Sequence, residues 1–182
     1  ADFAGNKAGT KGHQVHKFSP KGEKLLSLGI AGKPGNADGQ FNQPNDVVTG
    51  PDGSIYVSDG HDGQGMTTVK AVEEGIKRGA TARISKFTPD GKLLKEYATE
   101  THGGMAGFLG VTTASLAPDN RTLVYCSETG TRVFQYDIVA DKQLPDLITL
   151  QPGAGEMALL AQHLPDGTLL YIKASRATGF KL

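Results

Sequence analysis

Short runs of alternating apolar and polar residues, separated by turn sequences, follow one another along this chain of 182 residues. In residues 84–87, the apolar Ile and Phe flank the polar Ser and Lys, which predicts a β-strand with one buried and one exposed face. The Pro-Asp-Gly sequence at 89–91 favours a tight turn, because proline presets φ and glycine accepts positive φ. The Leu-Leu pair at 93–94 then begins a return strand, so the pattern predicts an antiparallel hairpin.

Two kinds of hairpin alternate along the sequence. The first kind carries Pro-Asp-Gly or Pro-Asp-Asn at 51–53, 118–120 and 165–167, followed by strands rich in β-branched and aromatic residues. The second kind begins at residues 13–18 and 82–87. An inner hairpin of the first kind and an outer hairpin of the second make a four-stranded antiparallel blade. Repetition of such blades predicts an all-β fold of the β-propeller type.

We expect one propeller domain over residues 1–182. It comprises an outer hairpin at 13–31, a blade at 45–98, a blade at 111–150 and an inner hairpin at 156–174. The first blade contains an inserted loop at 61–81. Within this loop Val69, Val72 and Ile76 fall on one face of a predicted short helix, which Gly75 interrupts.

The predicted strands amount to about three blades, whereas a closed propeller needs at least about four. Open sheets of this kind leave edges that pair with other chains. Two explanations stay open. Either the chain is part of a longer propeller of about six blades, or two copies form a homodimer that closes one ring. In the homodimer, the first outer hairpin of one copy completes the last inner hairpin of the other.

Composition narrows the classes of partner. The formal net charge is zero, whereas nucleic acids and membrane surfaces attract chains with a basic excess, so neither is expected as the main partner. No apolar run approaches the roughly 20 residues that span a bilayer. Cys126 is the single cysteine, which excludes an internal disulfide, and its position within a strand predicts a buried thiol.

Three segments resemble NHL repeats. They read Gln-Val-His-Lys-Phe-Ser-Pro at 14–20, Phe-Asn-Gln-Pro-Asn-Asp-Val-Val at 41–48 and Ile-Tyr-Val-Ser-Asp-Gly at 55–60. Over about residues 13–97 the chain is similar to the six-bladed propeller of peptidyl-α-hydroxyglycine α-amidating lyases. From Gly110 onward it looks more like gluconolactonase (SMP-30) and strictosidine-synthase-like propellers. The resemblance implies a six-bladed ring and a periplasmic or extracellular location.

The lyase resemblance also implies zinc, held at the central channel by histidines that follow a proline at the start of inner strands. The matching places here, Pro44-Asn45 and Leu109-Gly110, carry no histidine. The family uses a tyrosine directly after the strand-ending Ser-Asp-Gly, and His61 occupies that position in this chain. The corresponding blade of the family also lacks a histidine at the place of Asn45, whereas Gly110 and His61 depart from the family pattern.

Polar residues at the ends of the predicted inner strands form the candidate site. His61 follows one such strand and is the candidate catalytic acid or base, with Asp59 and Asp62 as neighbours that bind substrate or orient it. The alternative is that Asp59 caps a turn through its own backbone and that His61 is a solvated loop residue.

Two inner strands also begin with polar residues near the expected channel. Asn45 is a candidate for substrate binding, and Asp46 and Glu156 are candidates for metal binding, because calcium prefers oxygen ligands of this kind. The alternative for Asp46 is a hydrogen bond that fixes the backbone of the neighbouring blade.

These residues support two hypotheses about function. The first is a metal-dependent enzyme of the lyase or lactonase kind, which uses calcium or zinc and acts on a small molecule or a peptide at the central channel. The second is a non-catalytic propeller that binds a peptide or protein partner on its rim, with the 61–81 insertion as the contact. The repeat pattern is specific for fold and does not decide between them.

Overall fold

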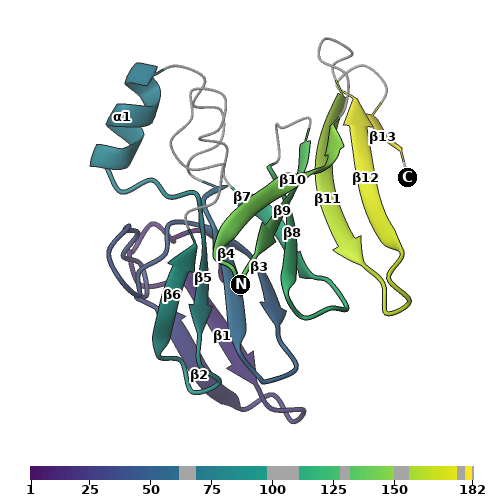
Figure 1. Cartoon of the computed structure of the whole chain (residues 1–182). Coiled ribbons are helices and arrows are strands. Elements are labelled where there is room, and N and C mark those ends of the chain that lie inside the picture. The colour runs from purple at the N-terminus through teal and green to yellow at the C-terminus, as the bar shows by residue number, and fades with distance from the viewer. Residues whose placement is uncertain (62–68, 98–110, 128–131, 150–155, 176–178, 182) are drawn as a thin grey trace.

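The chain is nearly all β, as the alternating pattern predicts (Figure 1). The computed structural model describes residues 1–61, 69–97, 111–127, 132–149, 156–175 and 179–181. The strands form four antiparallel sheets that follow one another along the chain. Two of these sheets have four strands each, and both use strands in the order of the sequence. The prediction of an all-β fold built from four-stranded antiparallel blades is therefore confirmed.

The four sheets have the following strands. The first pairs β1 (Gln14–Phe18) with β2 (Lys24–Gly29). The second contains β3 (Pro44–Thr49), β4 (Ile55–Asp59), β5 (Arg83–Phe87) and β6 (Leu93–Tyr97). The third contains β7 (Val111–Leu116), β8 (Thr122–Ser127), β9 (Arg132–Asp137) and β10 (Lys142–Thr149). The fourth contains β11 (Glu156–His163), β12 (Leu169–Ser175) and β13 (Gly179–Lys181).

The hairpin turns have the backbone conformation that the sequence predicts. Gly53, Gly91 and Gly167 have φ values of 78°, 93° and 86°, which glycine adopts without the steric cost of a Cβ. Asn120 takes the equivalent place in the Pro-Asp-Asn turn with φ of 54°, and asparagine tolerates this region better than most residues. The turn chemistry therefore fixes where each strand ends.

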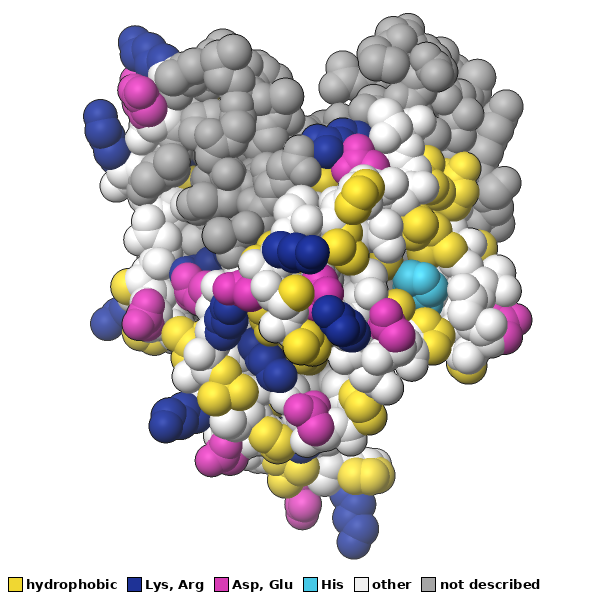
Figure 2. All heavy atoms as spheres, in the orientation of Figure 1, with side chains coloured by type: hydrophobic (Ala, Val, Ile, Leu, Met, Phe, Trp, Pro, Cys, Tyr) yellow, Lys and Arg dark blue, Asp and Glu magenta, His cyan; other side chains and the backbone are white. Residues whose placement is uncertain are grey.

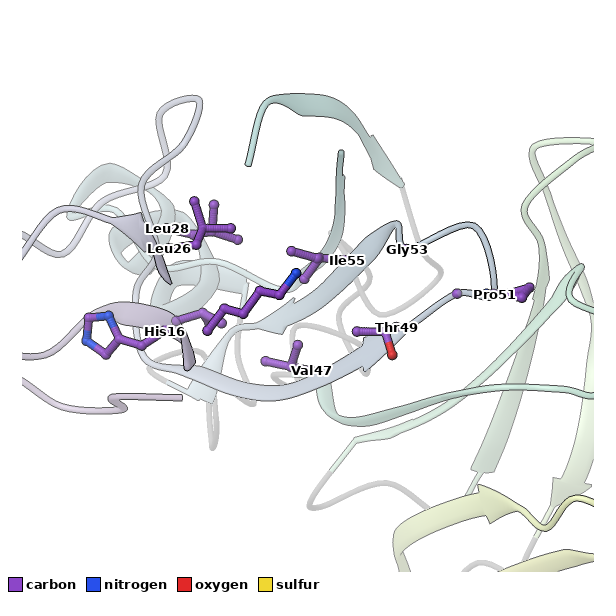
Figure 3. Close-up of a pocket in the computed structure, with 11 residues that line it drawn as sticks. His16, Leu26, Leu28, Val47, Thr49, Pro51, Gly53 and Ile55 are labelled. Carbon is purple, nitrogen blue, oxygen red and sulfur yellow. The ribbon is translucent and has the colours of Figure 1, made fainter. Parts of the chain in front are cut away.

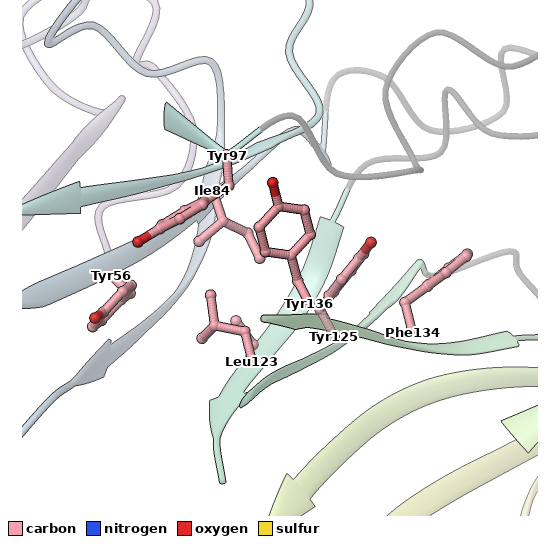
Figure 4. Packing of buried hydrophobic residues seen from close by; sticks show 8 residues of the cluster. Tyr56, Ile84, Tyr97, Leu123, Tyr125, Phe134 and Tyr136 are labelled. Atoms are coloured by element: carbon pink, nitrogen blue, oxygen red, sulfur yellow. The ribbon is translucent and has the colours of Figure 1, made fainter. Parts of the chain in front are cut away.

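The hydrophobic core lies between the sheets. One cluster joins the second sheet to the third, and Figure 4 shows its aromatic side chains converging between the two. Tyr97 of β6 meets Tyr136 of β9 edge-on, with ring centroids 5.4 Å apart. Val124 and Cys126 belong to another cluster, which packs the third sheet against Ala161 of β11. The expectation of a buried Cys126 thiol is confirmed.

The segment between β4 and β5 contains the helix α1 (Val69–Lys77), so the predicted short helix forms. Ala71 packs against Ala80 and Ala82, which attaches the helix to the segment leading into β5. The side chains of Val69, Val72 and Ile76 lie outside the described residues. In Figure 1 the helix projects from the sheets at the upper left.

The surface carries charges of both signs. Figure 2 shows Lys, Arg, Asp and Glu side chains interspersed over the lower half of the face in view. Among the described residues, no helix is both long and apolar enough to cross a membrane.

Candidate functional site

The first strands of three sheets, β3, β7 and β11, lie side by side and form the inner wall of the molecule. A carboxylate oxygen of Asp46 in β3 accepts a hydrogen bond of 3.2 Å from the backbone N–H of Ala114 in β7. The hydroxyl oxygen of Ser115 in β7 accepts one of 3.0 Å from the backbone N–H of His163 in β11. Each inner strand is thus fixed to the next by a bond between a side chain and the backbone.

Both carboxylate oxygens of Asp46 are engaged by backbone groups. Oδ2 accepts from Ala114, and Oδ1 accepts from the N–H of Val47 at 2.8 Å. The hydroxyl of Ser58 in β4 lies 3.1 Å from the backbone nitrogen of Asp46, which donates to it. This geometry corresponds to the alternative considered for Asp46, in which it fixes the backbone of the neighbouring blade.

Asn45 occupies an irregular position at the start of β3. The register between β3 and β4 shifts between Pro44 and Asp46, so Asn45 is the extra residue of a β-bulge. The register between β7 and β8 shifts in the same place, between Val111 and Thr113. The Oδ1 atom of Asn45 is buried and has no hydrogen-bond partner among the described residues.

Asp59 is completely buried at the end of β4. Its Oδ1 accepts from the backbone N–H of Asn42 at 2.8 Å, and its Oδ2 accepts from the hydroxyl of Thr81 at 3.0 Å. The Nε atom of Arg83 lies 3.5 Å from Oδ2. Asp59 therefore ties together the segment before β3, the segment before β5 and β5 itself.

Burial raises the pKa of Asp59 to about 6, because the carboxylate loses its solvation. The positive charge of Arg83 opposes this shift, as do the hydrogen bonds from Thr81 and Asn42. The loss of solvation outweighs these contributions. The carboxyl of Asp59 therefore titrates nearer to neutral pH than an exposed aspartate does.

Arg83 is a central residue at this end of the molecule that sequence reasoning missed. Its guanidinium donates to the backbone carbonyls of Asn36 at 3.0 Å and Gln40 at 2.6 Å, and to Glu96 of β6 at 2.7 Å. It thus holds the connection between β2 and β3 against the second sheet. The sequence does contain one signal for this role, because Arg83 is a charged residue near the start of a predicted strand. In the observed register Arg83 pairs with Asp59.

His61 lies directly after the buried end of β4. Its backbone N–H donates to the carbonyl of Gln43 at 3.4 Å, which places it beside the segment that leads into β3. Its ring meets that of Phe3 edge-on, with centroids 4.5 Å apart, and the residue is half-buried. It is therefore neither fully solvated nor fully enclosed.

The structure brings three of the predicted site residues to one end of the inner wall. Pro44, which precedes Asn45, is paired with Asp59, and His61 lies beside Gln43. Asp62 and the side chain of Glu156 lie outside the described residues, although Glu156 is the first residue of β11. Within the described part of the chain, no group of three or more His, Cys, Asp or Glu residues is arranged to hold a metal ion.

The known proteins that are similar to this chain in sequence or in structure include β-propeller lyases. No family model matches the chain. A probable peptidyl-alpha-hydroxyglycine alpha-amidating lyase of Caenorhabditis elegans is 31% identical over 90 residues, which are 49% of this chain and 21% of that protein. Virginiamycin B lyase from Staphylococcus aureus superimposes with a TM-score of 0.55 at 13% identity, over 93% of this chain and 47% of the lyase.

Two further solved structures are similar. A streptogramin B lyase superimposes with a TM-score of 0.55 at 15% identity, over 93% of this chain and 47% of its own. Hydrazine synthase of Kuenenia stuttgartiensis gives 0.59 at 14% identity, over 92% of this chain and 38% of its own. At such low identity these structures establish the fold, and this chain has a β-propeller fold. It spans about a fifth of the curated relative and less than half of each solved structure.

Proposed function

We propose that this chain forms part of a propeller enzyme that cleaves peptidyl-α-hydroxyglycine to a peptide amide. The observation that carries the proposal is the 31% identity over 90 residues to the probable amidating lyase of the worm. Two of the structurally similar propellers are also lyases, which is consistent with a cleavage without hydrolysis or oxidation. A six-bladed ring and a periplasmic or extracellular location belong to the same proposal.

The reaction is a cleavage of one carbon–nitrogen bond. The α carbon of the substrate carries a hydroxyl group, the amide nitrogen and a carboxylate. A base removes the hydroxyl proton, the oxygen–carbon bond becomes a carbonyl, and the carbon–nitrogen bond breaks with its electron pair on nitrogen. A proton returns to that nitrogen, so the products are the peptide amide and glyoxylate. No oxidant or reductant is consumed.

His61 is the residue proposed to move the proton. An imidazole exchanges protons near neutral pH and is the commonest general base in enzymes. His61 is half-buried and lies at the same end of the inner wall as Asn45. Asn45 is proposed to bind the substrate, because its buried Oδ1 has no partner in the described structure and accepts a hydrogen bond from an amide N–H.

The described residues do not supply a metal site. The oxygens of Asp46 accept backbone hydrogen bonds, and those of Asp59 are committed to Asn42, Thr81 and Arg83. Calcium or zinc therefore stays in the proposal only through Glu156 and Asp62, and no step of the reaction is assigned to a metal.

The test is a turnover assay with a short peptide that ends in α-hydroxyglycine. We expect the protein to form peptide amide and glyoxylate in equal amounts, and we expect His61→Ala to reduce kcat by at least about 100-fold, the usual contribution of a general base. His16→Ala is the matched control and should retain activity, because His16 lies on the outer hairpin, where it bonds to Ser27. Absence of product from the wild-type protein, or equal turnover by His61→Ala, would overturn the proposal.

A second candidate function is peptide or protein binding on the rim without catalysis. The observation that favours it is that both described carboxylates of the site serve the fold. The helix α1 also projects from the sheets and exposes Lys70, Glu73, Glu74 and Lys77 (Figure 1). Binding of the peptide without formation of amide, together with loss of binding in Lys70→Glu, would support this function over the first.

A further inference from the structure

Two residues near His61 have a backbone conformation that is uncommon outside glycine. Among the described residues, four non-glycine residues have positive φ, and two of them, Asn120 and Asp141, lie in hairpin turns. His13 and Gln43 are the other two, with φ values of 59° and 65°. They lie directly before β1 and β3, outside the hairpin turns. Turn formation therefore does not account for the conformation of these two residues.

Gln43 is the less expected of the two. Histidine is enriched among residues with positive φ, as asparagine and aspartate are, whereas glutamine is not. Gln43 also precedes Pro44, and a residue before proline prefers an extended backbone with negative φ. Strained backbone of this kind persists where the surrounding structure holds it, and it clusters at functional sites. The contacts that hold Gln43 are therefore of interest for the site beside it.

Backbone hydrogen bonds of Gln43 connect His13 to His61. The N–H of Gln43 donates to Nδ1 of the His13 ring at 3.3 Å. The carbonyl of Gln43 accepts from the backbone N–H of His61 at 3.4 Å. The conformation of Gln43 directs one of its backbone groups to each histidine. The ring of His13 thus holds the residue that fixes the backbone of His61.

The ring of His13 also lies against the segment that contacts the side chain of His61. His13 is only 6% exposed, and a Cβ added at Gly5 would lie 3.0 Å from its Nε2 atom. Two residues before Gly5, the ring of Phe3 meets the ring of His61 edge-on, with centroids 4.5 Å apart. The imidazole of His13 therefore packs beneath the segment that places Phe3 against His61.

This segment is anchored to residues on both sides of His13. The backbone groups of Asp2 and Gln14 exchange hydrogen bonds of 2.6 and 3.2 Å. The carboxylate of Asp2 accepts a further hydrogen bond of 3.0 Å from the backbone N–H of Gly12. Because Asp2 adjoins Phe3 in the sequence, the position of Phe3 depends on the backbone around His13.

We propose that His13 is a positioning residue for His61. Its Nδ1 atom holds Gln43, which fixes the backbone of His61, and its ring supports the segment that places Phe3 against the imidazole of His61. His13 acts through these residues and not on the substrate. The inference rests on the proposed function in one respect, since it takes His61 as the residue that moves the proton.

The hydrogen bond to Gln43 requires one particular form of the His13 ring. A ring nitrogen that accepts a hydrogen bond carries no proton, so the proton of the neutral imidazole is on Nε2. In the other tautomer, and in the imidazolium, Nδ1 is a donor and would face the N–H of Gln43. The proposal therefore requires the neutral Nε2–H tautomer of His13.

The first experiment is NMR spectroscopy of the wild-type protein with isotope-labelled histidines. The nitrogen chemical shifts show which ring nitrogen carries the proton, and the spectra of His13→Asn and His61→Ala assign the two sets of signals. We expect the Nε2–H tautomer for His13 at neutral pH. A proton on Nδ1 of His13 would overturn the proposal. This measurement needs no substrate and is independent of turnover.

Two variants of similar shape separate the hydrogen bond of His13 from its packing. In His13→Asn the amide oxygen accepts from Gln43 and asparagine tolerates positive φ, whereas His13→Leu has no acceptor. We expect the ring signals of His61 to shift in His13→Leu and to stay near their wild-type positions in His13→Asn. Equal shifts in both variants, or a shift in neither, would contradict the proposal. If His13→Leu does not fold, as urea denaturation would show, the wild-type tautomer decides.

Turnover measures the consequence for catalysis. We expect His13→Leu to lower kcat at least about 10-fold, because misplacement of a reacting group by about 1 Å costs up to about 100-fold, and His13→Asn to restore most of the loss. His16→Leu is the matched control and should retain kcat. His16 lies within β1, where it borders a cavity of about 400 Å³ that Leu28 and Val47 also line (Figure 3).

The two measurements distinguish the failure of each proposal. An active wild-type protein whose kcat is unchanged in His13→Leu would overturn the positioning role and leave the proposed function intact. An inactive wild-type protein in which His13→Leu still shifts the signals of His61 would overturn the proposed function and support the positioning of His61 by His13.

Discussion

The contact between two neighbouring blades can be tested at a single glycine. Gly91 and Gly22 occupy the same place in the turns of β5–β6 and β1–β2, with φ values of 93° and 84°. A Cβ at Gly91 would lie 2.8 Å from Leu26 and 2.9 Å from Leu28, whereas a Cβ at Gly22 would meet nothing within 4 Å. Gly91→Ala therefore adds a steric contact that Gly22→Ala lacks.

The two contributions have different magnitudes. Alanine at positive φ costs about 1 kcal/mol, and both variants should lose this amount of unfolding free energy. Overpacking against Leu26 and Leu28 typically costs about 1–3 kcal/mol more, at Gly91 alone. Leu28 belongs to the core cluster beneath β1–β2 and Leu26 packs against it, so the added Cβ meets the side-chain ends of two residues of that core. We expect Gly91→Ala to lose about 2–4 kcal/mol in total.

Urea denaturation of both variants beside the wild-type protein measures the difference. For a chain of this length, each kcal/mol corresponds to about 2–4 °C in melting temperature, so thermal unfolding gives an independent value. Equal losses in the two variants would refute the packing of the β5–β6 turn against β2. An unchanged stability in Gly91→Ala would refute the turn conformation itself.

Two further predictions concern the carboxylates of Asp59 and Asp46. The folded pKa of Asp59, about 6, exceeds the unfolded value of about 3.9, so its contribution to stability is present below the lower value and is lost as pH rises through about 6. Relative to Asp59→Asn, the wild-type unfolding free energy should fall by up to about 3 kcal/mol between pH 4 and 7, and parallel pH profiles in urea titrations would contradict this. Asp46→Ala should cost about 1–3 kcal/mol, because two backbone donors lose their acceptor, and Asp46→Asn should cost less. A rise in melting temperature with calcium or zinc that Asp46→Ala abolishes would instead identify Asp46 as a metal ligand.

The hairpins could be predicted from the sequence because their determinants are local. Proline and glycine set the turn within four residues, and β-branched and aromatic residues favour the strands beside it. The expectation of one exposed face is wrong for β5, which is buried at four of its five positions because other sheets and loops cover both of its faces. Asn120 shows that the pattern survives a substitution, since it adopts φ of 54° where the related turns have glycine. The short helix α1 also follows from its local apolar spacing, although Gly75 lies within it.

The roles of the polar residues could not be predicted in the same way. The partner of Asp46 is Ala114, 68 positions away, and the segments that meet at Asp59 come from three parts of the chain. A sequence shows that a carboxylate stands at a strand end. Whether its oxygens face the channel or a neighbouring backbone depends on how the blades pack, which is a property of the whole fold.

The hydrogen bonds of these polar residues distinguish those that stabilise the fold from those that are candidates for function. A carboxylate whose two oxygens already accept hydrogen bonds from the fold has less capacity left for a ligand, which describes both the half-buried Asp46 and the buried Asp59. Asn45 is different, because no described residue donates a hydrogen bond to its buried Oδ1, and a buried acceptor without a partner costs about 1–3 kcal/mol. Proteins depart from local rules of stability mainly at functional sites. The unsatisfied oxygen on a bulge, beside the segment that leads to His61, is therefore the strongest structural reason to place the site at this end of the inner strands.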